Sequence, residues 1–434
     1  MNKFFIKILK IKLRWLAKLI IWKFNPDIIA ITGSVGKTSA KEAIYAVLQN
    51  RKHVRKSSGN LNNELGMPLT ILKDFSDEEL KIVSRLPAQA GGYPAGKDKI
   101  KKMFFWLKAI FFALFKFLFS GKSSYPEILI LEYGADRPGD IKYLLEIAKP
   151  KIAVISAIGE TPVHIEFYES SQAVAKEKSK LLENLFTSNF ALLNFDDEMA
   201  MGMKEKTRAK IMTFGFNEGA DVKITNFENK FENNEVTGIS FKIEYAGSFV
   251  PISLKNVFGK SHAYAAAIGA AVGIIYNMNI VGIAESLSIN YKPAKRRMNL
   301  ILGMKNTHII DDSYNASPLS MKQALETLRD LKIENKIAIL GDMLELGEYS
   351  QKAHEEIGRL AAEGVDFLIT VGQNGKIIAL AAEKSGLPKE KILSFNKAEE
   401  AIKPVKKIIK NQDLILIKAS RGIGLDKVVD SLKI

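Results

Sequence analysis

The sequence predicts an α/β protein of two domains, the first built on a parallel sheet and the second a smaller, Rossmann-like α/β domain. Short apolar, β-branched runs such as "DIIAIT" (27–32), "EILILEYGA" (127–135) and "KIAVISAIG" (151–159) alternate with helical stretches. This alternation is typical of parallel, doubly wound sheets. Proline and a basic cluster interrupt it at "NYKPAKRRMNLI" (290–301), after which it resumes. A length of 434 residues fits two or three domains.

Each expected element follows from its local pattern. In the first domain we expect the three strands above, helices in 39–50, 138–149, 172–186 and 261–278, a strand and turn in 190–198, and antiparallel strands where residues alternate over 210–257. In the second domain we expect strands at "HIIDDS" (308–313), "KIAILGDM" (336–343), "FLITVG" (367–372) and "LILIKAS" (414–420). The expected boundaries are 1–26 for a basic amphipathic helix, 27–295 for the first domain and 296–434 for the second.

The positive charge is concentrated in two segments. Of the net charge of +15, residues 1–25 contribute +7 and residues 97–122 contribute +6. Both segments are also rich in large apolar side chains, which an arm that binds nucleic acid does not need, so we expect no nucleic-acid partner. The chain has no cysteine, which excludes disulfides, zinc–thiolate sites and a cysteine nucleophile and fits a cytoplasmic protein.

These basic segments have the composition of membrane-surface helices. In the first, cations step by three or four residues from Lys3 to Lys18, beside an apolar remainder, and no cleavable signal follows. In the second, "MFFWLKAIFFALFKFLF" (103–119) is shorter than the roughly 20 residues of a spanning helix. It belongs to an insertion-like stretch, 74–124, which also holds the glycine-rich "AGGYPAGKDK" (90–99). We expect peripheral contact with an anionic membrane surface; the alternative is packing on the protein's own core or on a partner subunit.

A phosphate-binding loop is predicted at residues 33–39, between the strand 27–32 and a helix. The loop consists of Gly33, Ser34, Val35, Gly36, Lys37, Thr38 and Ser39. Glycines allow backbone N–H groups to approach phosphate oxygens, the lysine reaches the β- and γ-phosphates, and the threonine hydroxyl holds Mg²⁺. The expected cofactors are therefore ATP and Mg²⁺.

Further polar residues follow the predicted strands. Glu132 ends the strand "ILILE", where a carboxylate could complete a Mg²⁺ site, although such an acid is more often only solvated. His164 lies after the strand 151–159, and Lys178 lies on a helix whose composition suggests a solvated face. "DDSYNASP" (311–318), Asp342 and Glu345, and "KASRG" (418–422) follow strands of the second domain. We expect these strand ends to meet in one crevice between the domains.

Several motifs resemble those of the Mur ligase family. They include "ITGSVGKTSAKE", "GNLNNELGMPLTIL", "LEYGADRPGDI", "HIEFYES", "AKEKSKLLENL", "DDSYNASPLSMKQAL", "LGDMLELGEYSQKAH" and "LIKASRG", and they span about residues 28–430. The DDSYN and GDMLELG stretches resemble the branch that adds D-alanyl-D-alanine to a UDP-N-acetylmuramoyl-tripeptide. Only about 26 residues precede the first strand, so the resemblance covers no counterpart of the family's usual UDP-holding domain.

The resemblance implies a mechanism and a set of residue roles. ATP would phosphorylate the muramoyl-peptide carboxylate, and the amine of D-Ala-D-Ala would attack the acyl phosphate to form the amide of a peptidoglycan precursor. The implied catalytic and metal residues are Lys37, Thr38, Glu132, His164 and Lys178, the last as a carbamate. Arg297, Asp312 and Asn315 would contact the nucleotide, whereas Asn62, Asn63, Lys418, Ser420 and Arg421 would face the substrates.

Three other functions stay open at this point. The chain could be another amino-acid ligase of the same superfamily, of the folylpolyglutamate or cyanophycin type. It could be a membrane-associated P-loop ATPase that forms no bond. It could also be an inactive scaffold, although the presence of Lys37, Thr38, Glu132, His164 and Lys178 argues against that.

Overall fold

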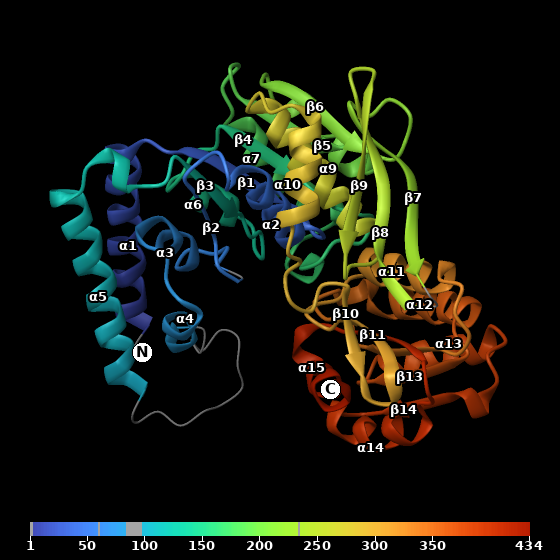
Figure 1. Cartoon of the computed structure of the whole chain (residues 1–434). Helices are drawn as coiled ribbons and strands as arrows, with labels where there is room; N and C mark the ends of the chain where they lie inside the picture. Colours follow the sequence, from blue (N-terminus) through green and yellow to red (C-terminus); the bar gives the residue numbers. More distant parts are fainter. Residues whose placement is uncertain (1–2, 60, 84–97, 233–234) are drawn as a thin grey trace.

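The computed structural model describes residues 3–59, 61–83, 98–232 and 235–434, and within them it contains two sheets (Figure 1). The first sheet has nine strands in the order β2-β3-β1-β4-β5-β6-β7-β8-β9. Its strands are β1 (Asp27–Thr32), β2 (Val54–Lys56), β3 (Ile128–Glu132), β4 (Ile152–Ile155), β5 (Phe190–Asn194), β6 (Lys210–Gly215), β7 (Val222–Glu232), β8 (Glu235–Tyr245) and β9 (Ser248–Lys255). The pairs from β2 to β6 are parallel, as the alternating pattern predicts.

The expectation of antiparallel strands throughout 210–257 was wrong at its start. β6 pairs in parallel with β5, and only β7, β8 and β9 pair antiparallel. Phe214 of β6 is fully buried and extends the apolar core of the parallel strands. Ala246 and Gly247, both with positive φ, form the tight β8–β9 connection, which permits antiparallel pairing.

Helices cover both faces of the first sheet. One face packs on α2 (Lys37–Leu48), α9 (Lys260–Ile275) and α10 (Ile280–Asn290). The other packs on α1 (Lys3–Phe24), α3 (Gly66–Leu72), α5 (Asp98–Phe119), α6 (Asp140–Leu145), α7 (Ser171–Glu183) and α8 (Glu198–Met201), with α4 (Asp77–Val83) beside α5. This layering confirms the predicted α/β class and leaves the carboxyl ends of β1, β3 and β4 at one edge.

The second sheet has six strands in the order β10-β11-β15-β12-β13-β14. Its strands are β10 (Asn299–Gly303), β11 (Thr307–Asp312), β12 (Lys336–Gly341), β13 (Phe367–Val371), β14 (Ile392–Phe395) and β15 (Leu414–Lys418). Helices α11 (Pro318–Asp330), α12 (Ser350–Gly364) and α13 (Gly375–Lys384) lie on one face, and α14 (Ala398–Ile408) and α15 (Asp426–Leu432) on the other. The four predicted strands are present.

The strands β2, β10 and β14 were not predicted. Each is short and only partly buried, so none matches the pattern of a fully buried strand. β10 pairs antiparallel with β11 and forms the edge of its sheet.

The two basic apolar segments form long helices that lie side by side at one end of the molecule (Figure 1). α1 buries Leu9, Leu13 and Ile20, and α5 buries Trp106 and Ala109, in the core of the first sheet. Packing on the protein's own core, the alternative to membrane contact, therefore holds for one face of each helix. Within the described residues, neither α1 nor α5 nor any other helix is long and apolar enough to cross a membrane. Most of the predicted glycine-rich stretch, 90–99, lies outside the described residues.

Candidate active site

The loop after β1 has the backbone of a phosphate-binding loop. Gly33 (φ 146°) and Gly36 (φ 89°) have positive φ angles, which favour glycine. A Cβ on Gly33 would lie 2.1 Å from the Ser156 Oγ, so the loop could not accept a side chain there without moving. The Ser34 N–H donates to the Ala157 carbonyl (2.6 Å), which fixes the loop against the end of β4.

The side chains of this loop are available for an anion. Lys37 lies at the first position of α2, and its ammonium donates to the Gly33 carbonyl (2.6 Å). Burial lowers the pKa of Lys37, an effect that the Glu132 carboxylate partly offsets. The Ser34 Oγ is buried and has no hydrogen-bond partner among the described residues. A phosphate group would satisfy Ser34, Lys37 and the first N–H groups of α2 together.

Glu132 is the buried carboxylate of the site. It ends β3, its Oε2 lies 3.4 Å from the Thr38 hydroxyl, and its Oε1 lies 2.7 Å from the Lys41 ammonium. Burial raises the pKa of Glu132, but the charges of Lys41, Lys37 and Arg297 outweigh it, and the pKa is lowered overall. Glu132 therefore presents an ionised carboxylate beside a hydroxyl, a combination that suits Mg²⁺.

Lys41 is a site residue that the sequence reading missed. Its side chain is 1% exposed, and besides Glu132 it donates to the Gly59 carbonyl (3.0 Å). In the sequence it resembles an ordinary solvated lysine of α2. The available signal was its spacing, since positions three and four residues after Thr38 and Lys37 lie on the same helix face.

His164 lies at the contact between the part of the chain that forms the first sheet (the first unit) and the part that forms the second sheet (the second unit). It has φ 65° and lies just before the short 3₁₀ turn Ile165–Phe167. Its Nε2 lies 3.3 Å from the Asp136 carboxylate, and its Nδ1 contacts the Glu345 carboxylate, which follows β12. The hydrogen bond from the Glu166 N–H to the Glu345 carbonyl (3.3 Å) strengthens this contact between the units.

Lys178 is a buried amine with an unusual pKa. It lies on α7, and it is 1% exposed. Burial, and then the neighbouring charge of Lys37, lower its pKa to about 7. At neutral pH, much of this amine is therefore uncharged and nucleophilic. The solvated face that composition alone suggested is wrong for Lys178, because α7 packs this side against the sheet.

The second unit contributes a cation to the same place. Arg297 stacks over the Tyr314 ring at 4.2 Å, and its charge affects the pKa values of Lys37, Glu132 and Lys418. Arg297 thus lies between the phosphate-binding loop and the ends of β11 and β15.

Asp312 and Asn315 lie beside Lys418 in the interior of the second unit. The Lys418 ammonium donates to the Asp312 carboxylate (2.5 Å) and to the Asn315 carbonyl (3.0 Å). Burial lowers the pKa of Lys418, although Asp312 acts in the opposite direction. These three residues form one network behind Arg297.

The remaining sequence-predicted residues differ in their exposure and contacts. The Ser420 hydroxyl is buried and accepts from the Leu344 N–H (2.9 Å), whereas Arg421 is exposed and 5.7 Å from the Tyr314 ring. The Asn63 Oδ1 accepts from the Gly66 N–H (2.9 Å) and so begins α3. The Asn62 carbonyl accepts from the Gly134 N–H (2.9 Å), which ties this loop to the end of β3.

Side chains of the described residues do not by themselves complete the coordination of a metal ion. Within the described residues, no group of three His, Asp or Glu side chains could hold a metal ion. Nucleotide-bound Mg²⁺ uses only one or two protein ligands, and phosphate oxygens and water supply the rest. Thr38 and Glu132 fit that demand.

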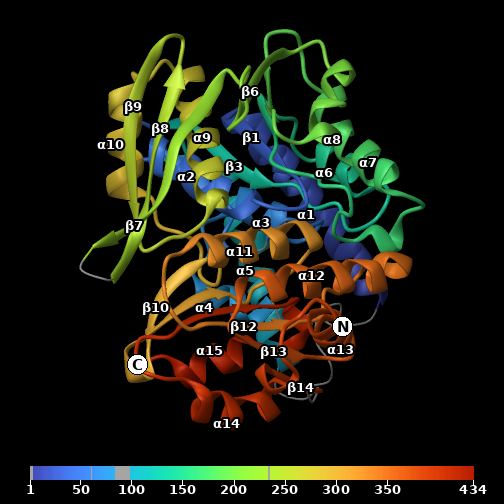
Figure 2. The ribbon, with the colours of Figure 1, turned by 90° about the vertical axis from the view of Figure 1, so that its right-hand side faces the viewer.

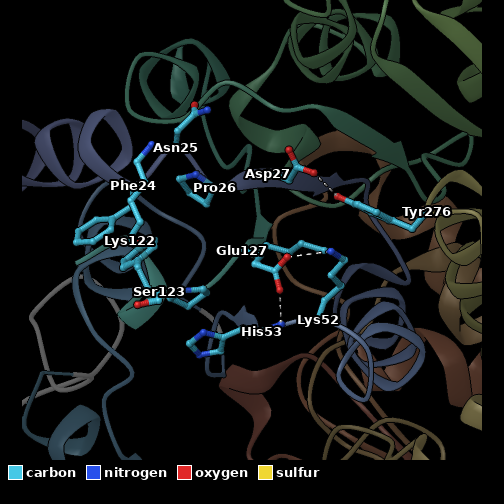
Figure 3. A pocket seen from close by; sticks show the side chains of 13 residues that line it. Phe24, Asn25, Pro26, Asp27, Lys52, His53, Lys122, Ser123, Glu127 and Tyr276 are labelled. Atoms are coloured by element: carbon cyan, nitrogen blue, oxygen red, sulfur yellow. Dashed lines mark hydrogen bonds and ion pairs between the residues drawn. The ribbon is translucent and has the colours of Figure 1, made fainter. Parts of the chain in front are cut away.

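A cavity of about 580 Å³ lies elsewhere (Figure 3). Asp27 at the start of β1 and Glu127 just before β3 line it, so it lies at the amino ends of these strands, opposite the phosphate-binding loop. Its two carboxylates are already partnered: Glu127 contacts Lys52 (2.9 Å), and Asp27 accepts from the Tyr276 hydroxyl (3.1 Å). We therefore assign the active site to the other edge.

Comparisons with known proteins identify the family of this chain. The Mur ligase middle domain matches residues 31–83 and 113–273, and the glutamate ligase domain of Mur ligases matches residues 296–421. The UDP-N-acetylmuramoyl-tripeptide--D-alanyl-D-alanine ligase of Bacillus subtilis is 29% identical over 422 residues, 97% of this chain and 79% of that protein.

Solved structures have the same fold. MurF from Acinetobacter baumannii superposes with a TM-score of 0.75 at 24% identity, over 97% of this chain and 80% of that one. MurF ligase from Thermotoga maritima in complex with ADP gives a TM-score of 0.74 at 23% identity, over 97% and 83%.

Proposed function

The chain belongs to the Mur ligase family, and on that premise we propose that it joins D-alanyl-D-alanine to the terminal carboxylate of a muramoyl-peptide. It is an ATP-dependent ligase of peptidoglycan precursor synthesis. The observation that carries the substrate proposal is the relationship to D-alanyl-D-alanine-adding enzymes over nearly the whole chain. The cluster of Lys37, Thr38 and Arg297 around the buried Glu132 supports the use of a nucleoside triphosphate.

The reaction requires positively charged groups that bind the phosphates of ATP and stabilise the negative charge that develops. The substrate carboxylate attacks the γ-phosphorus of ATP, so that an acyl phosphate forms and ADP leaves. The amine of D-Ala-D-Ala then attacks the acyl carbon, and loss of phosphate and a proton gives the amide. The phosphate-binding loop and Lys37 hold the phosphates, and Arg297 adds positive charge from the second unit where negative charge develops. Lys418, with Asp312 and Asn315, keeps the strand ends behind Arg297 in place.

We propose Mg²⁺ as the metal, held by Thr38 and Glu132, with His164 and a carbamate on Lys178 holding a further ion. Bound Mg²⁺ would neutralise phosphate charge during transfer. The Lys178 amine would add to CO₂ and lose a proton to give a carbamate, which replaces a cation by a carboxylate-like ligand. A pKa of about 7 supports this, because only the neutral amine adds to CO₂.

On the substrate side we propose that Arg421 and the Asn62–Asn63 loop contact the peptide substrates. Arg421 is exposed, and the loop borders the end of β3. We further propose domain boundaries at 26/27 and 295/296, a cytoplasmic location, and a contribution through wall synthesis to cell shape and division. The division between the two sheets and the limits of the family matches support the boundaries.

The test is ADP release by the purified chain with Mg²⁺, UDP-N-acetylmuramoyl-tripeptide and D-Ala-D-Ala, each omitted in turn. The proposal predicts that ADP release requires both the tripeptide and the dipeptide. ADP release with no acceptor would contradict it and favour a P-loop ATPase. Turnover only with another amino acid would favour a different ligase of the superfamily.

A further inference from the structure

The exposed apolar side chains of this protein are concentrated on two helices. Of the 22 large hydrophobic side chains that are exposed in the described part of the chain, 13 lie on α1 and α5. Scattered exposed hydrophobics need no explanation, but a contiguous patch marks a binding surface. These helices lie mainly outside the segments that the family models match. The ligase chemistry therefore does not account for this patch.

α5 is apolar on both of its faces. One stripe, including Phe105, Trp106 and Ala109, is buried in the core of the first sheet. The opposite stripe is exposed and repeats every three or four residues; it consists of Phe104, Leu107, Phe111, Leu114 and Leu118. A helix that is apolar all round is normally covered on every side, so the exposed stripe lacks its covering in this monomer.

α1 adds an exposed stripe beside it. Ile8, Ile11, Trp15 and Trp22 are exposed at helical spacing, and the two tryptophans are among the most exposed apolar side chains, at 63% and 77%. The two helices run in the same direction, since the Lys23 ammonium near the end of α1 contacts the Phe117 carbonyl near the end of α5. Both lie at the end of the molecule away from the second sheet (Figures 1 and 2).

The charges around these stripes identify the occupant. Lys7, Lys12, Lys101 and Lys122 are exposed on or beside the two helices. No acidic residue occurs in α1 or in the part of α5 after Asp98. Two such faces would repel each other, which argues against a second copy as the covering. An anionic bilayer surface offers an apolar layer beneath negative headgroups, and amphipathic aromatic and basic helices bind there.

A groove on α1 fits the headgroup level of such a surface. Lys7, Lys10, Arg14 and Trp15, with Ile11 and Tyr143, line a cavity of about 370 Å³. Lys10 and Arg14 are paired with Glu64 and Glu146, whereas Lys7 has no ion pair within the described residues. Tryptophan beside lysine is typical of the membrane interface.

We propose that α1 and α5 form a docking face, defined by their exposed stripes, that binds the chain peripherally to an anionic membrane. The apolar stripe of α5 enters the boundary between headgroups and acyl chains, and the lysines contact lipid phosphates. The ligase is thereby held at the bilayer without a spanning segment. This binding does not depend on the identity of the ligase's substrates.

Vesicle flotation of the full chain tests the proposal. We expect the chain to float with phosphatidylcholine vesicles that contain about 30% phosphatidylglycerol, and to float poorly with phosphatidylcholine alone. The double variant Phe111→Glu/Leu118→Glu should lower partitioning by roughly tenfold or more. The matched control is Phe249→Glu on β9, since Phe249 is 63% exposed and Phe111 64%. The control should float like the unchanged chain.

Tryptophan fluorescence gives an independent readout. The chain has three tryptophans, of which Trp106 is buried and Trp15 and Trp22 are exposed. Adding anionic vesicles should shift the emission to the blue, and Trp15→Phe/Trp22→Phe should abolish the shift while ADP release in solution stays unchanged.

Three results would overturn the proposal. One is no flotation with either vesicle. A second is equal loss of flotation in Phe111→Glu/Leu118→Glu and Phe249→Glu. The third is a chain that fails to bind vesicles and sediments as a dimer, with the double variant monomeric, because the face would then bind a second copy. Circular dichroism of each variant establishes that a loss of flotation is not a loss of fold.

Discussion

Replacing Lys41 by methionine should destabilise the first domain strongly. Lys41 and Glu132 are each 1% exposed and 2.7 Å apart, so the substitution leaves a buried carboxylate without its nearest cation. Methionine keeps the length of the side chain, and the main effect is the loss of charge. Removing one partner of a buried ion pair costs about 3–5 kcal/mol. At about 2–4 °C per kcal/mol for a domain of this size, the first thermal transition should fall by roughly 10 °C.

Two further variants separate the buried pair from a general effect of losing a lysine. Lys52 pairs with Glu127 at 2.9 Å, but both side chains are about half exposed, so Lys52→Met should cost at most about 1 kcal/mol. The double variant Lys41→Met/Glu132→Leu removes both buried charges together. Replacing a buried pair by apolar side chains is often neutral or stabilising, so the double variant should be more stable than Lys41→Met alone.

Scanning calorimetry at one pH measures these differences for five proteins: the unchanged chain, Lys41→Met, Lys52→Met, Glu132→Leu and the double variant. The reasoning predicts that Lys41→Met is less stable than both Lys52→Met and the double variant, and that Lys52→Met stays within about 1 kcal/mol of the unchanged chain. It is refuted if Lys41→Met and Lys52→Met have the same transition temperature. It is also refuted if Lys41→Met and Glu132→Leu add up in the double variant, because two residues in contact should be coupled.

Three other substitutions have expected outcomes. Lys178→Ala should abolish ADP release, and acetate, which can replace a lost carbamate, should restore part of it. In the unchanged chain, activity should fall as the pH drops below about 7. Burial lowers the Lys178 pKa to about 7, and the protonated amine cannot add to CO₂. Gly33→Ala should abolish ADP binding measured by calorimetry, since its Cβ would lie 2.1 Å from the Ser156 Oγ; retained binding would show that the loop can move. Ser317→Ala should lower the free energy of unfolding in denaturant by about 1 kcal/mol, because Ser317 and Ser320 form the capping box of α11. Activity should stay unchanged, and a loss of activity would assign Ser317 a second role.

The elements that sequence predicts best here are those with continuous apolar runs. β1, β3, β4, β12, β13 and β15 are buried on both faces, so most of their residues are apolar. β2 was missed because "VRK" is partly exposed and pairs with one neighbour only. β6 was assigned the wrong direction because it directly precedes the alternating hairpin strands, and direction depends on the partner strand rather than on local pattern.

The site residues also fall into those that local sequence predicts and those that it does not. The phosphate-binding loop was recognisable because its glycines are required locally, by positive φ angles and by the close approach of Ser156. The roles of Lys41 and Lys178 depend on burial by segments far away in the sequence, and a lysine on a helix gives no local sign of that. His164 and Glu345 are likewise about 180 residues apart in the sequence, and their contact depends on how the two sheets pack together.

Mass spectrometry of the reaction product tests the central claim most directly. The chain is incubated with ATP, Mg²⁺, UDP-N-acetylmuramoyl-tripeptide and D-Ala-D-Ala, and the products are quantified together with ADP. The account predicts a product heavier than the tripeptide substrate by one D-Ala-D-Ala less one water, formed in equal amount to ADP. ADP without that product, in the presence of both substrates, would contradict the assignment of this chain as a D-alanyl-D-alanine-adding ligase.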